Sequence, residues 1–282
     1  QEFGDSTTNF KQRASVSSST RTATAGGFSS PAFTNIIDFI TIASTANATD
    51  FGDLTVARRN IGGAGNNTRG IYLGGGSPGN TNTIDFITIA TAGNASDFGD
   101  ATAAKNGLGS LASPTRAVFG GGQDNVMEYV TIATTGNATD FGDLAQQNSG
   151  VSGGASSTTR AVVAGGYEQP AASQTSRLQF VILSSSGGAN DFGNLISGNN
   201  SALGCTSNNI RGIFYGGNNP EYVPFLTHIN LQSLGTDSSF GSTLVAQRNS
   251  AGVASGTRAV FAGGDASTGN LFAIQSIEFA TL

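Results

Sequence analysis

Hydrophobic positions along this chain fall into short runs that return in a fixed order. Residues 115–143 show the order best: an apolar run closes on glycines at 115–122, an alternating run follows at 126–132, and an Asp-Phe-Gly-Asp segment stands at 140–143. Short alternating runs rich in Val, Ile, Thr and Phe predict β-strands, and no stretch has the spacing of a useful amphipathic helix. The pattern therefore predicts an all-β protein.

The same unit occurs six times, which indicates a repeat architecture. Arginines open the apolar run at intervals of 44–51 residues, as Arg21, Arg69, Arg116, Arg160, Arg211 and Arg258. The alternating run returns at residues 37–42, 84–89, 127–132, 178–183, 226–231 and 277–282. The phenylalanine of the Asp-Phe-Gly-Asp segment returns as Phe3, Phe51, Phe98, Phe141, Phe192 and Phe240.

Each unit contains four predicted strands, which we call a to d. In the second unit, strand a is the small-residue segment 61–65, strand b is 69–73 and strand c is 84–89. Strand d holds the Asp-Phe-Gly-Asp segment at 97–100 and the run after it. Strand c carries apolar residues on both sides, which is typical of a sheet packed between two neighbours. The glycines and alanines of strand a suit a crowded common axis.

Four-stranded repeats of this length predict a β-propeller, whereas a linear solenoid would need atypical capping repeats. The chain begins inside a d strand at residues 2–5 and ends after a c strand at 277–282, so its two ends together make one unit. We therefore expect a six-bladed β-propeller of four-stranded antiparallel blades, with residues 1–282 as a single domain. The N-terminal strand should complete the last blade and close the ring, which removes exposed sheet edges.

Composition narrows the possible functions. The net charge is −5 and only Lys11 and Lys105 are lysines, which argues against a nucleic-acid-binding surface. No apolar run approaches the roughly 18–20 residues that span a bilayer, so we expect no membrane insertion. Cys205 is the one cysteine and His228 the one histidine. We interpret both as packing residues, and we expect no metal site and no cofactor.

The order of the repeat resembles the kelch family. The first complete unit has the double glycine Gly26-Gly27, an aromatic residue at Phe39, a second at Phe51 and a basic residue at Arg58. It departs from the usual kelch pattern by having Phe rather than Trp as the second aromatic residue, and by a longer separation between the two. The resemblance covers all six units.

Residues 130–144 (VTIATTGNATDFGDL) and 157–166 (STTRAVVAGG) are similar to kelch-like repeat proteins of tailed bacteriophages, particularly those infecting marine cyanobacteria. That resemblance implies a virion component, either a tail fibre or a capsid-decoration protein, with secretion as the alternative location. The implied partners are a host-surface glycan or protein and other virion proteins. It leaves homo-oligomerisation open.

Polar residues that recur in every unit are normally there to build it. The six arginines could form an anion-binding ring, but we expect them to make charge-assisted bonds to the Asp-Phe-Gly-Asp carboxylates. Those carboxylates could indicate acid–base chemistry or calcium binding, but we interpret them as turn caps that accept backbone N–H groups. Asn47, Asn94 and Asn137 match the glycosylation acceptor pattern, and their shared place in the repeat favours turn chemistry.

Differences between the units are more informative about binding. The segment between strands b and c is short at residues 123–125 and longer at 28–35, 167–176, 218–225 and 265–272. We expect the long segments on one face, either as ligand contacts or folded back as local plugs. The candidate contact residues are Phe28, Phe33, Tyr167, Glu168, Glu221, Tyr222, Phe225 and Phe272.

Together with the variable loops, the resemblance implies a non-enzymatic binding or structural module that attaches a phage particle to its host or decorates the particle. One alternative is a glycan lyase or hydrolase at the propeller axis, for which the acids outside the repeat are Glu168, Glu221 and Asp265. The other alternative is a cellular kelch-type scaffold for protein interactions.

Overall fold

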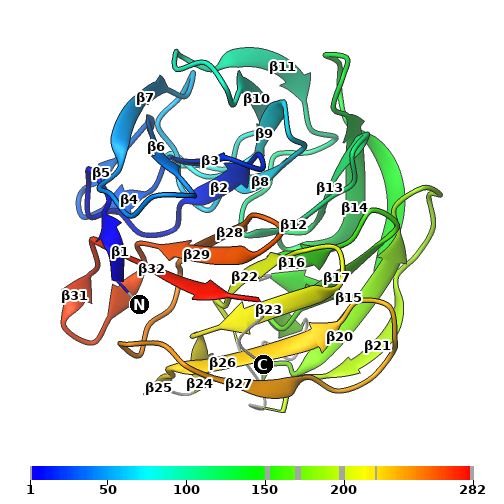
Figure 1. The fold of residues 1–282 in the computed structure, drawn as a ribbon. Coiled ribbons are helices and arrows are strands. Elements are labelled where there is room, and N and C mark those ends of the chain that lie inside the picture. The colour runs from blue at the N-terminus through cyan, green and yellow to red at the C-terminus, as the bar shows by residue number, and fades with distance from the viewer. Residues whose placement is uncertain (1, 150–152, 169–172, 197–200, 220, 280–282) are drawn as a thin grey trace.

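The chain folds as a six-bladed β-propeller of four-stranded antiparallel blades (Figure 1). The computed structural model describes residues 2–149, 153–168, 173–196, 201–219 and 221–279. The expected fold class is confirmed. None of the described residues forms a helix of the length and hydropathy needed to cross a membrane.

The strands of each blade follow the order a-b-c-d from the axis outward. The a strands are β2 (Ala14–Ser17), β8 (Gly62–Gly65), β12 (Leu108–Ala112), β16 (Gly154–Ser156), β22 (Gly204–Ser207) and β28 (Ala251–Ala254). The b strands are β3 (Arg21–Ala25), β9 (Arg69–Leu73), β13 (Arg116–Gly121), β17 (Arg160–Ala164), β23 (Arg211–Tyr215) and β29 (Arg258–Ala262). The c strands are β6 (Ile36–Thr41), β10 (Thr83–Thr88), β14 (Asp124–Thr131), β20 (Arg177–Ile182), β26 (Phe225–Asn230) and β32 (Ala273–Glu278). The d strands of blades 1 to 6 are β7 (Thr49–Asp53), β11 (Ser96–Asp100), β15 (Thr139–Ser149), β21 (Asn190–Asn194), β27 (Ser238–Ser242) and β1 (Glu2–Asp5).

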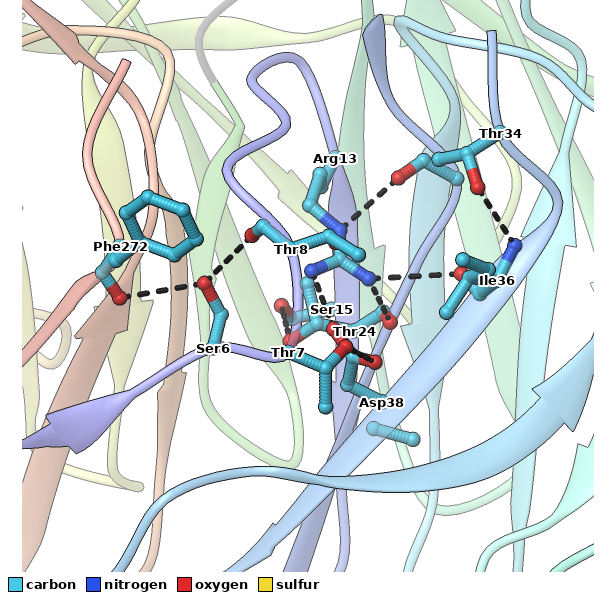
Figure 2. A network of polar contacts seen from close by, with 12 residues as sticks. Ser6, Thr7, Thr8, Arg13, Ser15, Thr24, Thr34, Ile36, Asp38 and Phe272 are labelled. Atoms are coloured by element: carbon cyan, nitrogen blue, oxygen red, sulfur yellow. Dashed lines mark hydrogen bonds and ion pairs between the residues drawn. The ribbon is translucent and has the colours of Figure 1, made fainter. Parts of the chain in front are cut away.

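The N-terminal strand closes the ring as expected. Strand β1 pairs antiparallel with β32, and Figure 1 shows the first strand in blue beside the last in red. Just after β1, the Ser6 N–H donates to the carbonyl of Phe272 at 3.0 Å. The Thr7 hydroxyl then donates to Asp38 of blade 1, so the closing strand is tied to the blades on both sides (Figure 2).

The hydrophobic core lies between the blades. The described residues form six buried clusters, and each is drawn from two adjacent blades. Between blades 2 and 3, for example, Leu73 and Ile84 pack in one cluster with Phe119 and Ile132. This arrangement explains why strand c carries apolar residues on both sides.

The six recurring arginines connect neighbouring blades, but not through carboxylates as we expected. Each donates from Nη1 to a main-chain carbonyl at the end of strand c in the next blade, as in the bond from Arg69 to Ile132 at 2.9 Å. Arg69 also lies 4.5 Å over the ring of Phe86 in its own blade. The bond from Arg258 to Ile42 completes the circle. The expected carboxylates lie instead on strand d, one strand further out.

The interpretation of the Asp-Phe-Gly-Asp carboxylates as turn caps is also wrong. Among the described residues, none of them accepts a backbone N–H. The contact that recurs is made by the asparagine in the next blade's c–d turn, since Asn94 Oδ1 accepts from the Asp53 N–H at 3.0 Å. Asn47 and Asn137 accept in the same way from Asp5 and Asp100. The side chains of these three asparagines therefore connect neighbouring blades by hydrogen bonds.

Several strand boundaries differ from the predicted ones, and two of the differences have a clear structural cause. In blade 1, strand d ends at Asp53, and the run after it leaves the sheet to reach blade 2, where Thr55 Oγ1 donates to Asp85 at 2.6 Å. In blade 6, strand c is β32 rather than residues 277–282, because Glu278 lies opposite Arg258. The predicted register was three residues too late, and residues 280–282 lie outside the described part of the chain.

Candidate functional site

The propeller has two unlike faces. The a–b and c–d turns lie on one, which we call the turn face; the b–c loops and d–a connections lie on the other, which we call the loop face. Three of the long b–c loops form separate two-stranded hairpins, and the blade 4 hairpin extends the blade 3 sheet. The hairpins are β4 (Phe28–Ser29) with β5 (Ala32–Phe33), β18 (Tyr167–Glu168) with β19 (Ser173–Gln174), β24 (Asn218–Asn219) with β25 (Glu221–Tyr222), and β30 (Asp265–Ala266) with β31 (Gly269–Asn270). Residues 169–172 of the second loop lie outside the described residues.

A residue in the left-handed conformation stands just before strand a in every blade where this position is described with its neighbours. These residues are Gln12, Asn60, Gly107, Ala202 and Asn249, with φ between 53° and 69°. They lie around the mouth of the axial channel, and some bond in sequence around it: the Asn60 N–H donates to the Gln12 carbonyl, and the Gly107 N–H to the Asn60 carbonyl, both at 2.9 Å. Asparagine tolerates this conformation better than most residues.

In blades 1, 2, 5 and 6, the residue before the left-handed position pairs with the start of the b–c loop. Lys11 pairs with Phe28, Arg59 with Gly76 and Arg248 with Asp265. Blades 6, 1 and 2, which are neighbours in the ring, thus carry Arg248, Lys11 and Arg59 here, and we call these three residues the basic crescent. Blades 3 and 5 carry Asn106 and Ser201 at the same position.

The left-handed residues show the same division between the blades. Blades 6, 1 and 2 carry the carboxamides Asn249, Gln12 and Asn60, whereas blades 3 and 5 carry Gly107 and Ala202. All five line a cavity of about 200 Å³ at the channel mouth, whose wall includes residues of all six blades. The half of the channel mouth formed by blades 6, 1 and 2 therefore carries side-chain amides, each preceded in the chain by a cation. Blades 3 and 5 fold without these groups, so the repeat does not need them.

Asp265 joins two of the crescent cations. Its side chain is 5% exposed, and its Oδ2 lies 3.2 Å from Arg248 Nε and 3.8 Å from Lys11 Nζ. Asn249 Nδ2 donates to Oδ1 at 2.8 Å, and the Tyr222 hydroxyl donates to Oδ2 at 3.0 Å. Burial, followed by the nearby Asp265 carboxylate, raises the pKa of Tyr222. Three hydrogen-bond donors, Tyr222, Arg248 and Asn249, hold the carboxylate, and it fixes the positions of both cations.

Arg59 holds the other end of the crescent. Its guanidinium lies 4.6 Å over the ring of Phe28 and 5.5 Å from that of Phe33, which is cation–π geometry. Its Nη1 also donates to Gln12 Oε1 at 3.3 Å. Arg248 lies over Tyr222 in the same way, at 4.7 Å. The rings of Phe28, Phe33 and Tyr222 therefore pack against guanidinium groups and orient them. They are not free aromatic contacts of the kind predicted from the sequence.

Arg13, whose contacts Figure 2 shows, follows Lys11 and Gln12 in the chain and fixes their segment. Its guanidinium forms a 2.6 Å ion pair with Asp38, and both side chains are nearly inaccessible to solvent. It also donates to the carbonyls of Gly26 and Thr24, each at 2.9 Å. A buried arginine with partners on several sides holds its chain segment in one geometry.

The remaining predicted contact residues are spread over the same face. Phe225 and Phe272 are 47% and 46% exposed, and they are the two aromatic candidates that project most into solvent. Tyr167 is half-buried, and its pKa is lowered chiefly by a hydrogen bond with Ser201. Glu168 forms a 2.9 Å ion pair with Arg177. The exposed Glu221 lies on the blade 5 hairpin beside Tyr222.

The crescent residues lie outside the predicted contact loops, although the sequence carries a signal for them. The chain has 13 lysines and arginines. Six bind the blades on the turn face, and three more lie in buried ion pairs: Arg13, Arg58 and Lys105. The four that remain are Lys11, Arg59, Arg177 and Arg248, and all four lie on the loop face.

Cys205 and His228 lie in packing positions, as expected. Cys205 is in the cluster between blades 4 and 5, and burial raises the pKa of its thiol. His228 occupies the aromatic position of strand c, with its ring 5.7 Å from that of Phe240. Among the described residues, no group of three or more His, Cys, Asp or Glu side chains could hold a metal ion.

His228 should make the stability of the protein sensitive to mild acid. Burial, followed by the charge of Arg211, lowers its pKa in the folded state. The unfolded state then takes up a proton first, so stability should fall as the pH drops below about 6.5, the ordinary value for histidine. Asp237 nearby has a pKa raised by burial, and its contribution has the opposite sign.

The His228→Phe variant isolates this effect, because strand c carries Phe at the same position in blades 1, 2 and 4. Urea unfolding at pH 7.5, 6.5 and 5.5 should show the wild-type midpoint falling relative to that of the variant. Parallel curves would mean that His228 keeps its ordinary pKa in the fold.

Comparison with protein-family models and with curated proteins finds no match to this chain.

Proposed function

We propose that the chain is a non-enzymatic binding module whose loop face contacts a glycan or protein on a host surface. The observation that carries the proposal is the contrast between the two faces. On the turn face the prominent side chains are used in bonds between blades. The loop face holds irregular hairpins, exposed aromatic side chains and cations that vary from blade to blade. Side chains with no role in the repeat, held on a rigid frame, are typical of binding sites.

The resemblance to kelch-like repeat proteins of tailed phages supports a place on the virion, as part of a tail fibre or as a capsid decoration. Secretion is the alternative location. Two of the acids outside the repeat already have cationic partners, since Asp265 is bonded by Arg248 and Glu168 by Arg177. These pairings favour binding over glycan hydrolysis at the axis.

Exposed aromatic side chains provide the test. Labelled protein should bind a glycan array or whole candidate host cells. We expect the Phe225→Ala/Phe272→Ala variant to bind about tenfold more weakly, since truncating a contact residue that matters costs roughly 1 kcal/mol or more. Both side chains are already half in solvent, so the variant should fold normally.

Leu234→Ala is the matched control, because Leu234 is 60% exposed and lies in a c–d turn on the opposite face. It should bind like the wild type. Equal binding by the loop-face variant would exclude these aromatic residues as contacts. Release of new reducing ends from a bound polysaccharide would contradict the non-enzymatic assignment.

A further inference from the structure

We infer that the basic crescent and the carboxamides beside it form a subsite for the carboxylate of an acidic saccharide. This inference rests on the proposed function and adds the chemical class of the ligand. It starts from an asymmetry: the same two positions hold a cation and a carboxamide in blades 6, 1 and 2, but Asn106-Gly107 in blade 3 and Ser201-Ala202 in blade 5. The fold accepts small neutral residues there, so the blades do not need the cations.

Charge favours an anion at this place. Of the described carboxylates, only Asp265 contacts the crescent, so three positive charges face one negative charge. The side chains of Lys11 and Arg248 keep 27% and 32% of their surface exposed. The remaining cation, Arg59, is linked to the Lys11–Gln12 segment by its bond to Gln12. Guanidinium groups held in fixed orientations bind carboxylates with two parallel hydrogen bonds.

The cavity and its amides favour a sugar as the carrier of the charge. Gln12, Asn60 and Asn249 line the cavity, and side-chain amides both donate to and accept from hydroxyl groups. Its volume of about 200 Å³ is below the roughly 300–1,000 Å³ of pockets that enclose a drug-sized ligand. It therefore suits one residue or branch of a longer chain that continues over the loops. A nucleic acid would need a basic stripe that follows its backbone, and three cations on a chain of net charge −5 do not provide one.

A pair of probes that differ only in charge tests the inference. Oligogalacturonate of about ten residues is compared with its methyl ester, and binding is measured by calorimetry at 50 mM and 300 mM salt. We expect the acid form to bind at least about tenfold more tightly than the ester, because only the acid form can accept charge-assisted hydrogen bonds from the crescent. Affinity for the acid form should fall at the higher salt concentration. A sulfated oligosaccharide of equal length shows whether the subsite prefers carboxylate over sulfate.

The variants take their residues from the other blades. The triple variant carries Lys11→Ser, Arg59→Asn and Arg248→Ser, which introduce the serine of blade 5 and the asparagine of blade 3 at the crescent positions. It should bind the acid form at least about tenfold more weakly than the wild type. Arg177→Gln removes a cation from the same face outside the crescent and should change affinity less than about twofold. Thermal unfolding of each variant shows whether it is folded. The comparison of acid and ester uses the wild-type protein, so it does not depend on the folding of any variant.

Three results would overturn the inference: equal affinity of the wild type for acid and ester, an unchanged affinity in the triple variant, or an equal loss in Arg177→Gln. Absence of binding to oligogalacturonate would overturn it as well. If the protein nevertheless binds neutral glycans or host cells through Phe225 and Phe272, the proposed function stands and only the acidic subsite is wrong.

Discussion

Replacing Gly142 by alanine should destabilise the propeller strongly, although the change adds a single methyl group. Gly142 belongs to the Asp-Phe-Gly-Asp segment of blade 3, and its φ is +135°. A Cβ there would lie 2.5 Å from the carbonyl group of Gly187, in the c–d turn of blade 4. Backbone strain and overpacking each cost about 1–3 kcal/mol, so we expect a loss of about 2–6 kcal/mol. The free energy of unfolding in urea measures it.

Two further alanine variants separate these contributions. Gly241 has a similar φ of +142°, but a Cβ there would meet nothing within 4 Å, so Gly241→Ala should show the strain alone. A Cβ at Gly187 would also meet nothing within 4 Å, and no positive φ is needed there, so Gly187→Ala should stay within about 0.5 kcal/mol of the wild type. Similar stabilities for Gly142→Ala and Gly241→Ala would show that close contact between blades does not explain the glycine.

This inter-blade role illustrates what the sequence could and could not predict. Repetition and alternation were enough for the blades, the strand order and the closure by β1, because these follow from local pattern and length. They were not enough for the partners of the recurring residues. Arg69 bonds to Ile132, and Asn94 to Asp53. A unit aligned on itself shows that these residues recur, but not which neighbour they touch.

The register of blade 6 failed for a different reason. Residues 277–279 repeat the Ile-acid-Phe order found at residues 37–39 and 84–86 of blades 1 and 2. Because strand c carries apolar residues on both sides, its pattern does not exclude a shift of three residues, although such a shift exchanges the two faces. Pairing decides the register, since Ile274 lies opposite Gly4 and Glu278 opposite Arg258. The repeat did not predict the basic crescent, because its residues precede strand a, outside both the repeat motif and the variable b–c loops.

The buried ion pair of blade 2 leads to the second large effect. Arg58 and Asp85 are both inaccessible to solvent, with Nη1 and Oδ2 3.0 Å apart. Burial lowers the pKa of Arg58, and the Asp85 carboxylate opposes that shift. Removing one partner leaves an uncompensated buried charge, so Arg58→Gln alone should cost about 3–5 kcal/mol in unfolding free energy.

Blade 6 shows how the double variant should behave. It carries Gln247 and Gln275 at the corresponding positions, with Gln275 Nε2 3.4 Å from Gln247 Oε1. The Leu244 N–H donates to Gln275 Oε1 at 3.1 Å, much as the Thr55 N–H donates to Asp85.

Arg58→Gln/Asp85→Gln should therefore recover most of the loss, and its cost should be well below the sum of the two single variants. A double-mutant cycle in urea measures this coupling. The partly exposed pair of Arg177 and Glu168 is the control, and its coupling should stay below about 1 kcal/mol. Additive losses at Arg58 and Asp85 would mean that the two side chains stabilise the blade independently. The ion pair between them would then contribute no coupling energy.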